Sequence, residues 1–189
     1  MKVVIAGDGE VGFFLAELLE KEYQDITLID KQIDKLASVE SKLGIATVWG
    51  DSTSYKVLSQ AGAQNADLLI AVTSVESTNI TTCLIGKKLG AKSTIARINN
   101  MEYLVDRETL DLRDLGIDEL VSPESLAARE VKYLLKSPVL TEVFNLYKKD
   151  LYMMGIRVED GAPVINKSIA GSAHLLSNSS FMIVAVLRN

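Results

Sequence analysis

The feature that most constrains this chain is a glycine-rich turn that directly follows an apolar strand near its beginning. Residues 3–6 are all apolar, and Gly7, Gly9 and Gly12 follow in G-x-G-x-x-G spacing. Asp30 closes the next apolar segment, about 20 residues further on. A glycine triplet alone is a weak signal, but strand, turn, helix and a carboxylate at this distance form the dinucleotide-binding pattern. We therefore predict an α/β domain that binds a nucleotide.

Each glycine of the turn has a predicted role. Gly7 permits the sharp turn, Gly9 lets the backbone approach a pyrophosphate, and Gly12 allows the helix to pack closely on the strand. The helix that follows offers free amides to the phosphates. The alternative is that the glycines serve only tight packing. Asp8 and Glu10 place carboxylates within the turn, and these would repel a phosphate-rich ligand if they pointed inward.

Asp30 can accept hydrogen bonds from both hydroxyls of an adenosine ribose. Its carboxylate would repel a 2′-phosphate, which favours NAD or an adenine mononucleotide over NADP. The alternative is an N-cap for the helix that follows, because Asp is a favoured capping residue. Both roles can coexist.

Further polar residues follow the expected strands at the edge where open α/β sheets bind ligands. Asp51 and Ser52 follow the third strand, and Thr73 and Ser74 follow the fourth. Arg97 lies near the end of the fifth strand and is suited to holding a phosphate bidentately. The alternative for Arg97 is an ion pair with a neighbouring acid.

The first part of the chain alternates short β-branched runs with longer amphipathic segments, as expected when helices cover both faces of a parallel sheet. We expect strands at Lys2–Gly7, Ile26–Asp30, Ala46–Gly50, Asp67–Val72, Thr94–Ile98 and Glu119–Ser122. Helical spacing predicts helices at Val11–Glu22, Asp34–Leu43, Tyr55–Ala61, Glu76–Leu89 and Met101–Leu115. Thr73 and Glu76 have capping-box spacing. The predicted fold class is an α/β Rossmann-like, doubly wound parallel sheet.

A second module is expected after Pro123. A helix begins at this proline, covers Glu124–Leu135 and ends near Ser137. Strand-like segments follow at Val139–Leu146, Leu151–Val158 and Phe181–Leu187, with a hairpin turn at 148–150. We therefore predict a nucleotide-binding domain at 1–122, a crossover helix or linker at 123–137 and a partial α+β subdomain at 138–189, which is small for an independent core.

Composition excludes several classes of function. The 189 residues carry a net charge of −5, which argues against binding of nucleic acid or anionic lipid, and the apolar runs are too short to span a membrane. The single cysteine, Cys83, fits a reducing cytoplasm and is interpreted as a buried helix residue. With a single histidine, His174, and no acid–base pair, we expect neither a metal site nor a catalytic site. Trp49 is interpreted as a core or interface side chain.

Taken together, these motifs resemble the RCK (KTN) family of potassium-transport regulators. The resemblance covers residues 1 to about 135. It is carried by MKVVIAGDGEVG at 1–12, ITLID ending at Asp30, VWGD ending at Asp51, AGAQNADLLIAVT ending at Thr73, the Glu76-x-x-Asn79 pair, Ile-Ala-Arg97-Ile and Ser-Pro-Glu124. The tail is similar to the family's C-terminal ligand-sensing subdomain in GAPVINKSIAG at 161–171 and IVAVLR at 183–188.

The resemblance implies a non-catalytic cytosolic subunit, peripheral at the inner face of the membrane. Its Rossmann domains would pair into dimers or higher rings beneath a membrane potassium channel or transporter, with the helix at 124–135 packed on a second subunit. Family members bind NAD(H) or ATP/ADP in the glycine-turn cleft, and AMP is a further candidate; the ring changes shape with the ligand and gates the pore. The implied nucleotide contacts are Gly7, Asp8, Gly9, Glu10, Val11, Gly12, Asp30, Lys31, Asp51, Ser52, Thr73, Ser74, Asn79 and Arg97.

Two further expectations accompany this resemblance. Because the chain stops earlier than the family's C-terminal subdomain normally ends and lacks a second Rossmann half, we expect an N-terminal fragment. The alternative function is a small NAD-dependent oxidoreductase or a nucleotide sensor unrelated to transport. Turnover of NADH with carbonyl substrates would favour that alternative, whereas nucleotide binding without turnover favours the regulatory module.

Overall fold

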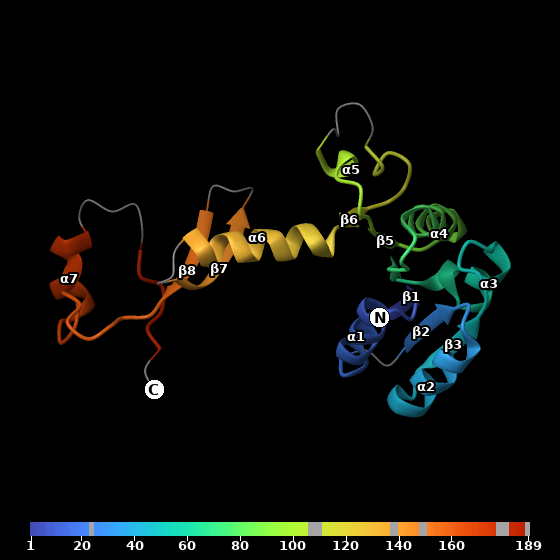
Figure 1. Cartoon of the computed structure of the whole chain (residues 1–189), viewed down its shortest axis with the longest axis horizontal. Helices are drawn as coiled ribbons and strands as arrows, with labels where there is room; N and C mark the ends of the chain where they lie inside the picture. Colours follow the sequence, from blue (N-terminus) through green and yellow to red (C-terminus); the bar gives the residue numbers. More distant parts are fainter. Residues whose placement is uncertain (23–24, 106–110, 137–139, 148–150, 177–181, 188–189) are drawn as a thin grey trace. The chain divides into compact units, whose positions relative to one another are not determined.

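Six parallel strands form one sheet in the order β3-β2-β1-β4-β5-β6 (Figure 1). The computed structural model describes the chain except for residues 23–24, 106–110, 137–139, 148–150, 177–181 and 188–189. The strands are β1 (Lys2–Ala6), β2 (Asp25–Asp30), β3 (Ala46–Trp49), β4 (Leu68–Ala71), β5 (Ser93–Arg97) and β6 (Glu119–Val121). The order reverses between β1 and β4, so the predicted Rossmann-like, doubly wound sheet is confirmed.

Helices connect the strands and cover both faces of the sheet. The helices between the strands are α1 (Glu10–Glu20), α2 (Ile33–Leu43), α3 (Tyr55–Gln60), the short 3₁₀ helix η1 (Ala63–Asn65), α4 (Glu76–Leu89) and α5 (Glu102–Val105), and α6 (Pro123–Lys136) follows β6. In Figure 1, α1 and α2 lie on one side of the sheet and α3 and α4 on the other. The predicted helices therefore agree with the structure to within a few residues, with α5 as the exception.

The alternation of side chains along β1 explains the two core layers. Val3 and Ile5 pack with Ala16 of α1 and with α2, while Val4 packs with Leu58 of α3 on the opposite face. Successive residues of a strand point to opposite faces, so a continuous apolar strand is required where helices cover both sides. All of these side chains are fully buried.

The helix predicted at Met101–Leu115 is wrong for most of its described length. Only α5 is helical, and residues 111–115 form turns, while 106–110 lie outside the described residues. The Asp111 carboxylate accepts a hydrogen bond from the backbone N–H of Arg113 at 3.0 Å. Asp competes with helix formation through such local bonds, so the apolar spacing alone misled the prediction.

The capping box predicted between Thr73 and Glu76 is also wrong. The N-cap residue of α4 is Val75, which makes no side-chain cap bond. Glu76 instead accepts hydrogen bonds from the backbone N–H groups of Asn99 and Asn100, beyond the end of β5. Glu76 therefore bonds to residues more than 20 positions away rather than to Thr73, the partner that the spacing predicted.

The chain divides into two units, Met1–Ala127 and Ala128–Asn189. In the second unit, β7 (Leu140–Tyr147) pairs antiparallel with β8 (Leu151–Ile156), as the hairpin prediction requires, although the turn itself lies outside the described residues. Helix α7 (Ile169–Leu176) was not anticipated; Ser168 caps it by accepting the Gly171 N–H at 3.0 Å. The strand expected at 181–187 is wrong for residues 182–187, which form neither helix nor strand. The three-part division at residues 122 and 137 stays a prediction.

Candidate functional site

The glycine turn joins β1 to α1, and the three glycines have different surroundings. Gly7 has φ +108°, a backbone conformation that side-chain-bearing residues rarely adopt, and a Cβ there would lie 2.9 Å from the backbone nitrogen of Thr73. A Cβ on Gly12 would lie 1.8 Å from the carbonyl oxygen of Gly7. Gly9 is exposed, and a Cβ there would meet no atom within 4 Å. The turn therefore packs tightly at its two ends and leaves its middle open.

Asp30 ties this turn to the end of β2. Its carboxylate accepts the backbone N–H of Asp8 and that of Gln32, both at 2.8 Å. The N-cap of α2 is Gln32 rather than Asp30, so the capping alternative for Asp30 is wrong. A carboxylate has about four lone-pair positions, so two backbone bonds leave acceptor capacity for a ligand.

Two acidic residues flank Gly9 in different environments. Asp8 is 7% exposed, and burial, together with the neighbouring Asp30 carboxylate, raises the pKa of its side chain above the ordinary value. Glu10 is exposed at the first turn of α1 and lines the cavity described below. Of the two acidic residues in the turn, Glu10 lines the cavity and Asp8 does not.

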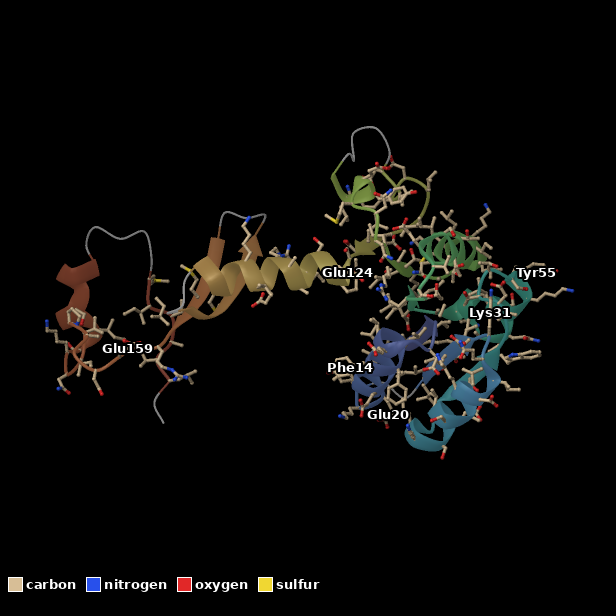
Figure 2. All side chains as sticks on the ribbon, viewed as in Figure 1. Phe14, Glu20, Lys31, Tyr55, Glu124 and Glu159 are labelled. Atoms are coloured by element: carbon tan, nitrogen blue, oxygen red, sulfur yellow. The ribbon has the colours of Figure 1, made fainter. Side chains whose placement is uncertain are left out.

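An ion pair joins the ends of β2 and β3. Lys31, labelled in Figure 2, places its Nζ 2.9 Å from Oδ2 of Asp51. The backbone N–H of Thr53 at 2.9 Å and the Lys31 ammonium lower the pKa of Asp51 to about 2. Trp49 donates its indole N–H to the Lys31 carbonyl at 2.9 Å and is 65% exposed. Of its two interpretations, the core one is wrong and the interface one stays a prediction.

Ser52 points away from this exposed pair. It is 4% exposed, and its hydroxyl lies 3.0 Å from that of Thr82 on α4, which is fully buried. This hydrogen bond fastens the loop after β3 to α4. Of the two predicted positions after β3, Asp51 is therefore the accessible one.

The loops after β4 and β5 are joined by Asn79 of α4. Its Oδ1 accepts the backbone N–H of Thr73 at 2.8 Å and the Thr73 hydroxyl at 2.7 Å. Its Nδ2 donates to the carbonyls of Thr73 and Arg97, each at 3.0 Å. Ser74, the next residue along the chain, is exposed.

A cavity of about 460 Å³ lies beside the open middle of the glycine turn. Its lining consists of Gly9, Glu10, Val11, Val72, Ser74, Arg97, Pro123, Glu124 and Ala127. This volume falls in the range of small-molecule sites. Asp30, Lys31 and Asp51 do not line it, so the predicted residues form two neighbouring groups at one sheet edge, one around the cavity and one at the ends of β2 and β3.

Arg97 is the cationic side chain in the cavity lining. Its Nη2 lies 2.6 Å from Oε1 of Glu124, on the first turn of α6 (Figure 2), while its buried Nε has no hydrogen-bond partner among the described residues. The pKa of Glu124 is lowered by its own backbone N–H and by Arg97. The ion pair that was the alternative for Arg97 is therefore present.

Four lining residues were not predicted as site residues: Val72 just after β4, and Pro123, Glu124 and Ala127 of α6. A usable signal was available, because α6 begins directly after β6 and therefore at the same carboxyl edge of the sheet as the glycine turn. From the sequence, Glu124 is predicted only to begin a helix and to carry part of the family resemblance. Glu124, on the first turn of α6, pairs with Arg97, and both residues line the cavity at the edge of the sheet.

Cys83 has the environment of an inert thiol. It is fully buried, its Sγ donates to the Ile95 carbonyl at 3.3 Å, and burial raises its pKa to about 12. The interpretation as a buried helix residue is confirmed. Among the described residues no group of three or more His, Cys, Asp or Glu side chains is arranged to hold a metal ion. His174 lies in α7, and its side chain lies outside the description.

The family model of the TrkA-N domain matches residues 3–123, which is most of the first unit. The chain belongs to the TrkA-N domain family. It is 33% identical to the Trk system potassium uptake protein TrkA of Haemophilus influenzae and 34% identical to a TrkA homolog of Archaeoglobus fulgidus, in each case over 100% of this chain and 42% of the relative. The chain thus spans less than half the length of these curated relatives.

Solved structures share the fold of this chain. The GsuK RCK domain superposes with a TM-score of 0.61 at 21% identity, over 91% of this chain and 36% of that one. GsuK bound to ADP superposes with a TM-score of 0.56 at 32% identity, over 71% of this chain and 33% of that one. The two curated relatives are named as potassium uptake proteins, in agreement with the expected absence of catalysis. None of the helices that the structure describes is long and apolar enough to cross a membrane.

Proposed function

We propose that this chain is a regulatory module of potassium transport that binds an adenine nucleotide, NAD(H), ATP/ADP or AMP, at its glycine turn. The observation that carries the proposal is the open space at Gly9, which faces a cavity lined by Arg97 and Ser74. A diphosphate placed there meets the first amides of α1 and a guanidinium with an unpaired Nε. The ADP-bound GsuK structure, at 32% identity, supports the same class of ligand.

The second group of residues receives the nucleoside in this proposal. Asp30 keeps free lone pairs for ribose hydroxyls, and its charge disfavours a 2′-phosphate, so NAD and ADP are preferred over NADP. The Lys31–Asp51 pair and the exposed ring of Trp49 border the adenine end. The TrkA relatives support a potassium channel or transporter as the membrane partner, with the chain assembled as a dimer or ring at its cytoplasmic side.

Regulation follows if the nucleotide binds two arrangements of the protein with different affinities. A ligand shifts such an equilibrium only by its differential affinity for the two states. Glu124 competes with an incoming phosphate for Arg97, because both are anions within reach of one guanidinium. Binding at the cavity therefore acts on the first turn of α6, which continues into the second unit.

Calorimetric titration with NADH, NAD, ATP, ADP and AMP tests the binding step. Asp30→Ala is expected to weaken binding of the preferred nucleotide by about 1.5–3 kcal/mol, the size of a hydrogen bond to a charged group. Asp25→Ala, at the exposed opposite end of β2, is the matched control and is expected to leave affinity unchanged. Equal affinity of the Asp30 variant and the wild type, both folded by circular dichroism, would reject the assignment.

A further inference from the structure

Asn79 is a buried polar side chain whose hydrogen-bonding capacity is fully used. It is 1% exposed, and its amide makes four hydrogen bonds, two as acceptor and two as donor. A primary amide has two N–H donors and two acceptor lone pairs. No position therefore remains on Asn79 for a ligand.

The bonds of Asn79 begin where the β-sheet ladder between two strands stops. The pairing of β4 with β5 ends at Ala71 and Ala96. Asn79 then bridges the carbonyls of Thr73 and Arg97, just beyond these last paired residues. The side chain of one helix thus joins two chain segments that the sheet itself no longer holds together.

Glu76, three residues earlier on the same face of α4, makes the companion contacts. Its carboxylate accepts the backbone N–H groups of Asn99 and Asn100 at 2.5 and 2.6 Å. The backbone of Arg97 is therefore fixed by Asn79, and the two residues that follow Ile98 are fixed by Glu76. The first turn of α4 holds both loops of the cavity edge.

We propose that Asn79, assisted by Glu76, is a positioning residue that sets Ser74 and Arg97 at the cavity and makes no contact with the nucleotide itself. The inference rests on the proposed nucleotide binding and deepens it. It replaces the expectation that Asn79 is a direct contact. The two segments that Asn79 joins carry Ser74 and Arg97, which both line the cavity. The distance between these segments therefore decides whether one phosphate group can contact both Ser74 and Arg97.

Asn79→Asp is the test, because the volume stays the same and one oxygen still accepts from Thr73. The second oxygen replaces the donor that faced the carbonyls of Thr73 and Arg97. We expect the backbone amide signals of Ser74 and Asn100 in the nitrogen-15 spectrum of the ligand-free full chain to move, and the Kd for ADP to rise at least tenfold. The amide of Gly44, at the end of α2, is expected to stay in place.

Cys83→Ala is the matched control, since Cys83 lies on the same helix, is fully buried and donates to the carbonyl of Ile95, and neither residue lines the cavity. It is expected to lower the melting temperature while the Kd for ADP stays within twofold. If Asn79→Asp does not fold, Glu76→Ala removes the companion contacts and is expected to raise the Kd for ADP at least threefold, with the Asn100 amide displaced.

Three results would overturn the positioning role. The first is an unchanged ADP affinity in the folded Asn79→Asp variant. The second is a loss of ADP affinity while the amide signals of Ser74 and Asn100 stay in place, which would indicate direct contact with the ligand. The third is an equal loss of ADP affinity in Cys83→Ala. If the wild type binds none of the nucleotides, the proposed function fails. The amide signals of the ligand-free protein then decide the positioning role alone.

Discussion

Gly9 and Gly12 belong to one turn but differ in the space around them. Gly12 faces the carbonyl oxygen of Gly7 at a separation that leaves no room for a methyl group, whereas Gly9 has a β-region backbone with φ −77° and open space beside it. Any residue can adopt that conformation. The requirement for glycine is therefore structural at position 12 and, in our proposal, a matter of ligand access at position 9.

Substitution by alanine is expected to separate these two requirements. Gly12→Ala should lower the free energy of unfolding by about 1–3 kcal/mol through overpacking, despite the better helix propensity of alanine. Gly9→Ala should change it by less than about 0.5 kcal/mol, while nucleotide affinity falls because the methyl group projects into the approach of the pyrophosphate. Urea unfolding followed by Trp49 fluorescence and calorimetry measure both effects. Equal destabilisation by the two substitutions would contradict this account.

At the scale of helices and strands, contacts of Asp118, the residue before β6, hold this short strand to its neighbours. Asp118 accepts the backbone N–H of Thr94, at the start of β5, at 2.7 Å and the ammonium group of Lys87 on α4 at 2.8 Å. β6 has three residues and lies at the edge of the sheet, so its own ladder is short. One carboxylate therefore joins α4, β5 and β6.

Asp118→Ala is expected to lower the free energy of unfolding at pH 7 by about 1–3 kcal/mol, because it leaves a backbone N–H of the fully buried Thr94 without its partner. Asp25→Ala, which breaks an exposed pair with Lys2, should cost less than about 1 kcal/mol. Although burial opposes the shift, Lys87 and the Thr94 amide hold the pKa of Asp118 below its ordinary value.

The sign of the pH dependence follows from that lowered pKa. A carboxylate with a lowered folded-state pKa stabilises the protein above its unfolded pKa, about 3.9 for Asp, and loses this contribution as the pH falls. The difference in stability between wild type and Asp118→Ala should therefore be constant from pH 7 to 5 and shrink from pH 4 to 2. Chemical denaturation across this range measures it, and a difference that grows on acidification would contradict the prediction.

At the scale of the whole molecule, the first unit holds both a core and the cavity. Among the described residues, the clusters of buried apolar side chains draw on positions between Val3 and Leu120, and the cavity lining ends at Ala127. A domain of this length can bury a sufficient core by itself. In the second unit, by contrast, Met153, Met154 and Ile156 of β8 are 42%, 48% and 57% exposed.

A chain that ends at Lys136 is therefore expected to fold and to bind nucleotide. We expect cooperative thermal unfolding by circular dichroism and a Kd for the preferred nucleotide within threefold of the full chain, because every residue of both proposed groups is retained. The separate chain 128–189 serves as the comparison. Loss of cooperative unfolding in the chain that ends at Lys136 would show that the first unit depends on the second.

Local patterns in the sequence were sufficient for the strands of the sheet, the glycine turn after β1 and the position of Asp30. Strand alternation, helical spacing and turn chemistry act over a few residues, so they can be identified without knowledge of the fold. The same patterns failed at 101–115, where the local hydrogen bond of Asp111 competes with the helix, and at Glu76, whose partners are the distant amides of Asn99 and Asn100. They also gave no account of how the predicted polar residues divide into two groups.

Tertiary structure alone decided the contacts of Asn79 and Arg97 and the exposure of Trp49. One of the four hydrogen bonds of Asn79 reaches a carbonyl 18 positions away, and Arg97 pairs with a carboxylate 27 positions away. Trp49 is exposed because β3 lies at the edge of the sheet, a place that strand order determines and hydrophobicity does not. The physical reason is common to all three: hydrogen-bond saturation, ion pairing and exposure depend on which chain segments meet at the sheet edge, and that meeting exists only once the sheet has formed.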